Sequence, residues 1–468
     1  MKIQVKEIGA IKEGTIDLSK KLNVFCGPNG TGKTYMAYLI YALTKLDNKS
    51  IGITMNENDL KSLLSNNTFS LQLDTNLLWK YRKEEINNVK NNLWNLFSIP
   101  EERAKSFFLS TEIISLETRE IFDEKVYQMF IDKEIRLYNY NFLIKKNKDS
   151  LNVDISIDTE SIKDVAFKQF MEIVFLSKLF SFVTFYPITT SVIFPVERNS
   201  IYTFSKELSI KRNEALEHLE AIASKKDVDL FDLYFKRSTR YPQPIRDILK
   251  VAEDLENTQK RNSKFHDFAI EIEKELLKGK VIINKETGGV DFQCDKSPKF
   301  KLSFHQSSSI VKTLASLVIY LKYEAKDNDL VLIDEPELNL HPDNQVKLAR
   351  IFARLVNNGI RLVISTHSDY IVREINNLIM VSSDHPVIKS ISKKFEYRDD
   401  EYLKKDDVGA YVFDFKRTSK REANQVEVKE IEITDSGFEI PSVDATINSQ
   451  NEIAEELFYT LKYGKTDE

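Results

Sequence analysis

The sequence contains few cysteines, and the central part of the chain contains no glycine. Only Cys26 and Cys294 occur among 468 residues, too few for a disulfide framework or a cysteine-bound zinc site. The first residues also lack the apolar core of a secretory signal peptide. These absences argue against a disulfide-stabilised secreted scaffold, and we expect a cytoplasmic protein.

Long apolar runs are absent as well. The most apolar stretch, residues 175–196, is interrupted by Lys178 and Pro187. A membrane-spanning helix needs about 20 predominantly apolar residues. A buried helix followed by a buried strand explains this stretch better, so we expect no membrane partner.

Neither sign of charge dominates. The formal net charge is −5, with 30% charged and 42% hydrophobic residues, which is typical of a globular protein rather than a disordered one. This balance argues against a protein that coats nucleic acid. Two local basic segments, residues 236–246 and 416–421, are typical of solvated surface. DNA therefore stays open as a partner.

Glycine is distributed unevenly. Three of the 13 glycines lie within residues 27–32, and none lies between residues 53 and 278. Because glycine in a helix interior costs about 1 kcal/mol, residues 51–279 are predicted to form a mainly helical insertion with a few short strands. The predicted helices are at 78–97, 164–182, 206–221, 245–258 and 265–277, and the predicted short strands are near 137–143, 151–157 and 191–194.

The flanking parts of the chain have the spacing of alternating strands and helices. A hairpin is indicated by Gly288 and Gly289, and two strand–helix units and a final coda follow it. This pattern predicts an α/β fold in which residues 1–50 and 280–468 form one domain. Its predicted elements include strands at 3–7, 14–18 and 22–26, a helix at 35–43, strands within 426–433 and a last helix at 452–461.

Residues 27–34 match the pattern G-x-x-x-x-G-K-[ST] of a phosphate-binding loop. A buried strand is predicted before the loop and a helix after it, so the loop amides lie at the positive end of the helix dipole. Lys33 is predicted to contact the β- and γ-phosphates of a nucleotide, and the Thr34 hydroxyl to bind Mg²⁺. The predicted nucleotide contacts of this loop are Asn29, Gly30, Thr31, Gly32, Lys33 and Thr34.

Two acidic residues, Asp334 and Glu335, follow the apolar run 330–333. Four consecutive apolar residues are typical of a strand buried on both faces of a parallel sheet, whose carboxyl end opens onto the ligand crevice. Asp334 is the predicted Mg²⁺ ligand. Glu335 is predicted to orient and deprotonate the attacking water, a contribution of roughly 10²–10⁴ in rate.

A histidine follows the next predicted strand. His367 comes shortly after the apolar run 361–364, at a strand end from which an imidazole reaches a γ-phosphate. We predict that it acts in catalysis with Glu335 and Lys33, and a purely structural histidine is the alternative.

Three serines, Ser307, Ser308 and Ser309, precede a strongly amphipathic helix at 310–321. Hydroxyls and free amides at a helix start bind an anion well, so these serines are predicted nucleotide contacts. Simple helix capping by serine is the alternative.

Taken in order, these motifs resemble those of ABC-class ATPases. The likeness is strongest to the OLD-like, AAA15/AAA21-type bacterial ATPases, and within that group to the ATPase subunits of the PARIS and Septu anti-phage systems. It covers residues 1–50 and 280–375. It rests on the phosphate loop, the serine-led helix, I-D-E-P-E at 333–337, L-H-P at 340–342 and S-T-H-S at 365–368.

The resemblance implies an ABC-type P-loop NTPase head that binds ATP and Mg²⁺, in a homodimer or a larger homo-oligomer. In such ATPases two heads face each other, and the serine-led helix of one closes on the nucleotide of the other. Asn339, Leu340 and His341 would then lie at the shared interface. Arg198 either approaches this site or forms a buried salt bridge.

The sequence also departs from the pattern of these families. Ser309 stands where the usual signature has a glycine, and the glutamine of the usual Q-loop has no assignable counterpart. OLD nucleases continue into a further domain with a D-x-D acid pair, which the residues after His367 lack. The D-x-D at 227–229 lies between predicted helices and is typical of a helix cap.

We therefore expect a Mg²⁺-dependent ATPase that senses a phage-derived trigger and controls a separately encoded nuclease or toxin. Two alternatives remain open: a DNA-repair ATPase resembling RecF, and a nucleotide-gated scaffold with little turnover. A transporter ATPase fits less well, because the sequence has neither membrane segments nor an L-S-G-G-Q signature.

Overall fold

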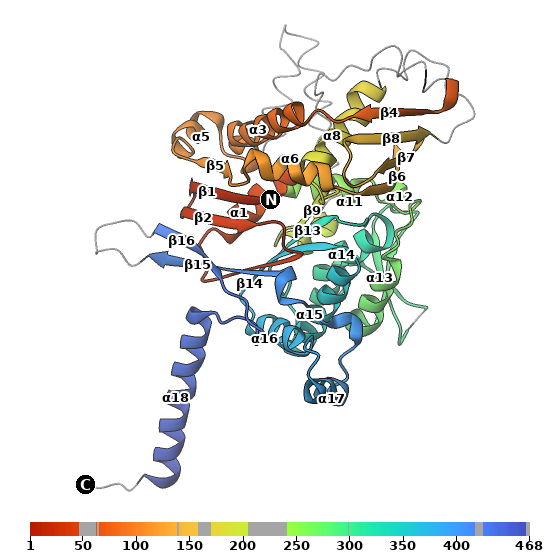
Figure 1. Ribbon diagram of the computed structural model, residues 1–468. Helices are drawn as coiled ribbons and strands as arrows, with labels where there is room; N and C mark the ends of the chain where they lie inside the picture. Colours follow the sequence, from red (N-terminus) through yellow and green to blue (C-terminus); the bar gives the residue numbers. More distant parts are fainter. Residues whose placement is uncertain are drawn as a thin grey trace, which may run out of the picture.

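The strands and the loop helix predicted at the N-terminus are confirmed in the computed structural model (Figure 1). The structure describes residues 1–45, 62, 65–137, 140–157, 170–204, 241–297, 299–416 and 425–464. The predicted helix 206–221, the basic segments 236–240 and 417–421 and the D-x-D at 227–229 lie outside the described residues.

A nine-stranded sheet is the centre of the described part of the chain. Five neighbouring strands, from β15 through β3, β14 and β13 to β9, run parallel. The other side of the sheet is mixed, because β16 pairs antiparallel with β15 and β1 pairs antiparallel with β2 and β5. In spatial order the strands are β5 (Glu112–Ser115), β1 (Lys2–Ile8), β2 (Ile11–Asp17), β16 (Gln425–Ile431), β15 (Val408–Lys416), β3 (Leu22–Cys26), β14 (Arg361–Thr366), β13 (Leu330–Asp334) and β9 (Ser191–Phe194).

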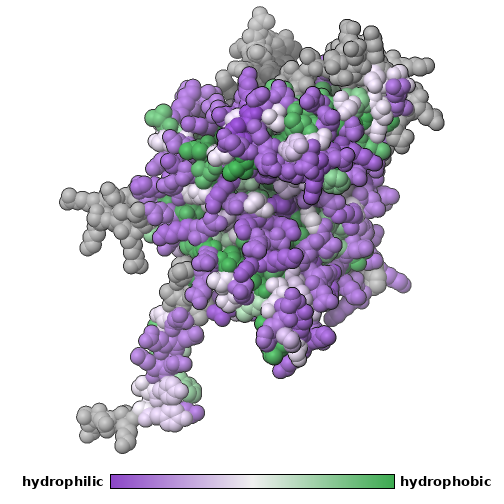
Figure 2. Space-filling view, viewed as in Figure 1, coloured by the Kyte–Doolittle hydropathy of each residue, from purple (hydrophilic) through white to green (hydrophobic). Residues whose placement is uncertain are grey.

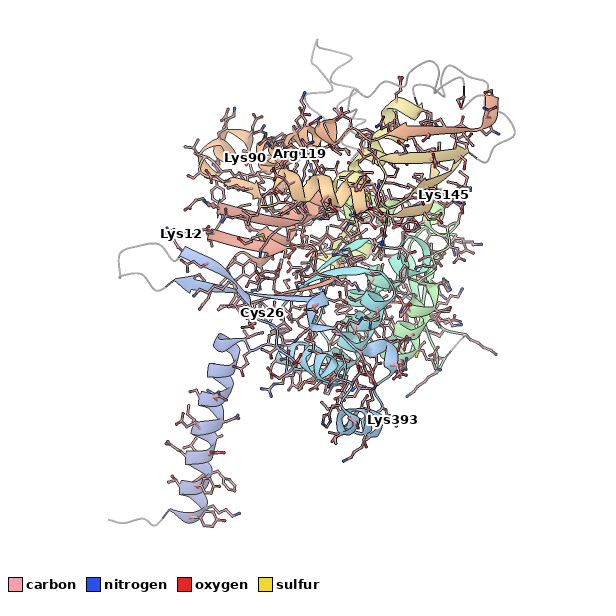
Figure 3. The ribbon with its side chains drawn as sticks, viewed as in Figure 1. Lys12, Cys26, Lys90, Arg119, Lys145 and Lys393 are labelled. Atoms are coloured by element: carbon pink, nitrogen blue, oxygen red, sulfur yellow. The ribbon has the colours of Figure 1, made fainter. Side chains whose placement is uncertain are left out.

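The register of the parallel strands brings their carboxyl ends to one edge. Asp334 at the end of β13 is opposite Ser365 of β14, and Thr366 of β14 is opposite Cys26 of β3. Figure 3 labels Cys26, the last residue of β3, in the middle of the molecule. The phosphate loop follows Cys26 directly, so the three predicted motifs converge at this edge.

Side chains of β13 alternate between two cores. Val331 and Ile333 belong to the core on one face of the sheet, and Leu330 and Leu332 to the core on the other. Burial on both faces explains why this strand is continuously apolar. The first core packs against α13 (His266–Ile272), α14 (Ser309–Tyr323), α15 (Pro342–Asn357) and α16 (Asp369–Met380), and the second packs against α1 (Lys33–Thr44), α4 (Leu93–Leu96) and α5 (Glu101–Phe107).

The segment 51–279 contains more strand than the sequence indicated. Its described residues include a four-stranded sheet in the order β4-β8-β7-β6. The sequence predicted one strand near 137–143, whereas the structure has two antiparallel strands there, β6 and β7. Two further strands of this segment, β5 and β9, join the central sheet as its two edges. The four strands are β4 (Thr68–Gln72), β6 (Ile131–Leu137), β7 (Tyr140–Lys146) and β8 (Asn152–Ile157).

Several helices of this segment pack on the four-stranded sheet and form a third core with it. They include η1 (Met171–Phe175) and α8 (Leu176–Thr184), which together with β9 confirm the buried helix and buried strand expected at 175–196. Among the described residues, no helix is long and apolar enough to cross a membrane. Besides α4, α5 and α13, the described residues of the segment also form the helices α3 (Thr75–Asn91), α6 (Arg119–Gln128), α11 (Gln243–Glu253), α12 (Leu255–Thr258) and η2 (Glu273–Leu277).

The C-terminal part leaves the body of the molecule. The last helix, α18 (Pro441–Tyr463), projects away from the sheet (Figure 1), and its described side chains are exposed. The viewed face of the body is largely hydrophilic (Figure 2). The remaining elements are β10 (Gly279–Ile283), β11 (Val290–Cys294), β12 (Lys301–Ser303), η3 (Phe304–Gln306), α17 (Pro386–Lys394), η4 (Asp399–Glu401) and η5 (Lys405–Asp407).

The central strand gives a direct test of this packing. Leu332 is fully buried in β13, so Leu332→Ala is expected to lower the free energy of unfolding by about 2–5 kcal/mol. Leu461→Ala is the control, because Leu461 is 88% exposed on α18 and should change stability by no more than about 0.5 kcal/mol. Urea denaturation measures both variants, and equal effects would contradict the assignment of β13 to the core.

Candidate functional site

The phosphate loop lies between β3 and α1 and depends on its glycines. Gly27, Gly30 and Gly32 have φ angles of 137°, 76° and 90°, a region that side chains disfavour. A Cβ atom at Gly27 would lie 2.2 Å from the carbonyl oxygen of Phe413. The Lys33 ammonium donates hydrogen bonds to the carbonyls of Gly27 (2.9 Å) and Pro28 (2.8 Å), so it lies inside the loop.

A hydrogen bond joins the loop to the acidic strand. The Thr34 hydroxyl donates to Asp334 Oδ2 at 2.7 Å, and the Ser365 hydroxyl donates to Asp334 Oδ1. Both oxygens of the buried Asp334 carboxylate therefore have a hydroxyl partner. Burial lowers the pKa of Lys33, and the nearby Asp334 opposes that shift.

Glu335 follows Asp334 in a left-handed conformation, with a φ of 48°. Its backbone N–H donates to the Ser365 carbonyl at 3.0 Å. Burial and the Asp334 charge raise the pKa of the Glu335 carboxyl, whereas Lys33 and Arg198 lower it. A raised pKa makes a carboxylate a stronger base, which suits a group that takes a proton from water.

The His367 imidazole lies beside this carboxylate. Its Nε2 is 3.8 Å from Glu335 Oε1, and both side chains are about one-third exposed. Burial and the Lys33 charge lower the pKa of His367 below its ordinary value of 6.5. The imidazole is therefore neutral at pH 7 and retains one N–H to donate.

The second acid of the I-D-E-P-E run positions the histidine segment. Glu337 Oε1 accepts hydrogen bonds from the His367 N–H (2.7 Å) and from the Thr366 hydroxyl (2.9 Å). Its other oxygen is buried without a hydrogen-bond partner in the described structure. Burial raises the pKa of Glu337, and these two hydrogen bonds oppose the shift.

Arg198 approaches the site, as one of the two expectations for it had it, through the backbone of Asp334 and Glu335. The salt bridge of the other expectation is not formed in the described part of the chain. It is 2% exposed. Its guanidinium donates to the backbone carbonyls of Pro195 (3.0 Å), Thr313 (3.2 Å), Asp334 (2.5 Å) and Glu335 (2.6 Å).

The three serines lie at the start of α14. The Ser307 hydroxyl donates to the Ser303 carbonyl at 3.3 Å. Ser308 is the N-cap residue, but its side chain makes no capping hydrogen bond. Within the described ranges, no hydrogen bond joins Ser307, Ser308 or Ser309 to the phosphate loop, and their predicted role in a second head stays a prediction.

The three residues predicted at the shared interface come immediately before α15. Leu340 is buried and Asn339 donates to the Thr313 hydroxyl at 3.4 Å. The His341 side chain is exposed and lies 3.7 Å from the Asp343 carboxylate.

Sequence reasoning missed Ser365 and Glu337 as parts of the site. Ser365 lies in the recognised motif S-T-H-S and Glu337 in I-D-E-P-E. A polar side chain next to a motif at a strand end was the signal that indicates a place in the site. Arg198 had no such signal for its contacts, because its partners are backbone carbonyls from three separate parts of the chain.

The oxygen ligands at this edge fit a hard divalent cation. The Thr34 hydroxyl and the Asp334 carboxylate are in contact, and Mg²⁺ prefers one or two such protein oxygens together with substrate phosphates. Among the described residues, no group of three or more His, Cys, Asp or Glu side chains forms a metal cluster.

This arrangement defines an ATPase of the ABC class, with a phosphate loop, an acidic strand and a histidine segment at one edge of an α/β sheet. The profile of the AAA_15 family, an AAA ATPase domain, matches residues 1–372. Because the match covers most of the chain, the chain belongs to this family.

Curated relatives match over shorter regions. The DNA replication and repair protein RecF of Streptococcus pneumoniae (strain ATCC 700669 / Spain 23F-1) is 27% identical over 176 residues, which cover 33% of this chain and 46% of RecF. RecF of S. pneumoniae strain P1031 is 34% identical over 95 residues, which cover 19% and 26%. The chain thus spans less than half the length of the curated relatives it matches.

Solved structures overlap with this chain only loosely. A SmcHead bound to the C-winged helix domain of ScpA has 11% identity and a TM-score of 0.36, covering 93% of this chain and 98% of that chain. The SMC head domain from Thermotoga maritima has 9% identity and a TM-score of 0.30, covering 92% and 98%. The assignment of the fold rests on the topology and the family match.

Glu337 allows a test of the contacts that hold the histidine segment. Its folded pKa is raised above 4.5, so the folded state retains the proton more tightly than the unfolded state. The stability that this proton provides is fully present below pH 4.5 and is lost as the pH rises through the folded pKa. Glu337→Gln does not titrate, so the stability of this variant relative to the wild type should increase across that range.

Glu337→Ala is the matched control. It does not titrate either and also removes the acceptor for the His367 N–H, so it should be less stable than Glu337→Gln by about 1–3 kcal/mol at every pH. Urea denaturation from pH 4 to 8 measures both variants. A Glu337→Gln variant whose difference from the wild type is independent of pH would show that Glu337 has no raised pKa.

Proposed function

We propose that this chain is a Mg²⁺-dependent ATPase that closes two copies of its head around ATP and controls a separately encoded nuclease or toxin in anti-phage defence. The contact between Thr34 and Asp334 carries the ATPase part of this proposal. It joins the end of the phosphate loop to the acidic strand, and Lys33, Glu335 and His367 surround it.

Each side chain has a distinct role in the proposed reaction. The loop amides from Asn29 to Lys33 bind phosphate oxygens at the start of α1, where the helix dipole favours an anion. Lys33 adds a positive charge to the same place. The Lys33 ammonium donates to two carbonyls of the loop, which hold it close to the loop amides.

The metal would be held by Thr34 and Asp334, the two side chains whose oxygens already meet. Bound Mg²⁺ neutralises charge on the β- and γ-phosphates. Ser365 donates to the other oxygen of Asp334 and so fixes the orientation of the carboxylate. Carboxylates that hold a metal are usually hydrogen-bonded in this way by neighbouring groups.

Glu335 is the proposed general base. Its carboxylate would accept a proton from the attacking water at an Oε atom, and its raised pKa favours that transfer. The His367 imidazole lies next to it, and in the proposed reaction it would donate an N–H to the transferred phosphoryl group. Glu337 holds the His367 backbone in place for this contact.

The dimer part of the proposal concerns the three serines. Ser308 is the N-cap and Ser309 the first residue of the 15-residue helix α14, whose positive end favours an anion. By analogy with ABC-class ATPases, this end would close on the nucleotide of a second head. The defence part rests on the resemblance to the PARIS and Septu ATPase subunits, and co-purification with the product of an adjacent nuclease or toxin gene tests it.

A DNA-repair ATPase is the second candidate, and the matches to RecF favour it. RecF is described as a DNA replication and repair protein. ATPase activity that DNA stimulates, with a steep loss of affinity as salt increases, would support this candidate. ATPase activity that responds to the adjacent effector but not to DNA would support the first.

Two substitutions test the ATPase assignment. Lys33→Ala is expected to abolish ATP binding, because the phosphates lose their charged partner. Glu335→Gln is expected to bind ATP as the wild type does but to hydrolyse it roughly 10²–10⁴-fold more slowly, and to accumulate as a closed oligomer. Isothermal titration, phosphate release and size-exclusion chromatography with ATP measure these effects.

Two outcomes would contradict the assignment. Equal turnover by the wild type and Glu335→Gln would remove Glu335 as the base. Bound ATP that the wild type leaves intact over hours would show a nucleotide-gated scaffold instead of an ATPase.

A further inference from the structure

Arg198 is a buried cation that bonds only to backbone in the described structure. It lies just after the edge strand β9, and its guanidinium donates to four carbonyls. Burial lowers the pKa of Arg198 to about 10, so the side chain stays charged at neutral pH. A buried charge is costly unless its donors are well satisfied, and here the four carbonyls satisfy them.

Two of these carbonyls belong to the catalytic segment. Arg198 donates to the carbonyls of Asp334 (2.5 Å) and Glu335 (2.6 Å). On the other side of the same residue, the Glu335 N–H donates to the Ser365 carbonyl. Both peptide groups of Glu335 are thus fixed, and a non-glycine residue keeps a left-handed φ only when its surroundings determine it in this way.

A third carbonyl belongs to the helix that the serines begin. Arg198 Nε donates to Thr313 in the first turns of α14. Asn339, four residues after Glu335, donates to the Thr313 hydroxyl. The start of α14 and the segment after β13 are therefore connected twice, although the two lie in separate parts of the sequence.

We propose that Arg198 is a positioning residue that couples α14 to the catalytic carboxylate. When the start of α14 engages a nucleotide on a second head, Arg198 transmits the shift of Thr313 to the backbone of Glu335. Hydrolysis in one head then depends on engagement of its own α14 with the other. This inference rests on the proposed ATPase function and adds its regulation.

The planar fork of arginine is essential to this role. Arg198 uses Nε, Nη1 and Nη2 to reach carbonyls that lie in different directions. A lysine keeps the charge, but its single ammonium does not reproduce this geometry. Arg198→Lys therefore separates the loss of positioning from the loss of charge.

A second buried arginine provides the matched control. Arg361 is 5% exposed and also donates to backbone carbonyls, those of Leu18, Ser19 and Lys20. It lies at the start of β14, at the opposite end of the strand from Ser365. Arg361→Lys should reduce thermal stability about as much as Arg198→Lys does but leave turnover unchanged.

Steady-state kinetics and ATP binding on the full chain test the proposal. Arg198→Lys should lower kcat at least tenfold, while the Kd for ATP stays within about twofold of the wild type, since binding and positioning are separate contributions. The double variant of Arg198→Lys with Glu335→Gln should have the same kcat as Glu335→Gln alone, because Arg198 acts through Glu335. An unchanged kcat in Arg198→Lys, or losses that multiply in the double variant, would overturn the proposal.

Hydrogen exchange on the wild type gives a measurement that needs no variant. With a non-hydrolysable ATP analogue, protection should rise together in peptides covering 307–316 and 333–340, and protection of 307–316 alone would overturn the coupling. Wild-type protein without any ATP turnover would instead remove the proposed function, and this inference with it.

Discussion

The hydrogen bond between Thr34 and Asp334 joins two residues that are 300 positions apart in the sequence. The rest of the site depends on this contact, because it fixes the phosphate loop against the acidic strand. The parallel order of β3, β14 and β13 makes the contact possible by bringing three strand ends to one edge. Continuous apolar strands, buried in a separate core on each face, keep that edge in register.

Around the contact of Thr34 with Asp334, hydrogen bonds to backbone groups position the site residues as much as hydrogen bonds between side chains do. Glu335 has a conformation that few side chains tolerate, and hydrogen bonds on both of its peptide groups hold it there. The backbone N–H of His367 donates to the Glu337 carboxylate. Preorganised groups of this kind need little rearrangement when charge develops in a reaction, and such preorganisation is a large part of catalysis.

The sequence predicted the phosphate loop, Asp334, Glu335 and the strand before each of them, because these motifs carry their structural context within a few residues. It did not predict the sheet membership of β5 and β9, since pairing between distant strands leaves no local pattern. The segment was expected to be mainly helical because it contains no glycine between residues 53 and 278, an absence that does not exclude strands such as β6 and β7. Arg198 was located but its partners were not, because carbonyls have no sequence signature.

In the proposed site one triphosphate contacts the loop, the acidic strand and the histidine segment together. A crystal structure of the full chain with Mg²⁺ and a non-hydrolysable ATP analogue tests this most directly. We expect a metal about 2.1 Å from the Thr34 hydroxyl oxygen and near Asp334. We expect the γ-phosphate between Lys33 and His367. A nucleotide bound elsewhere, or a γ-phosphate remote from both Glu335 and His367 in every pairing of copies, would contradict it.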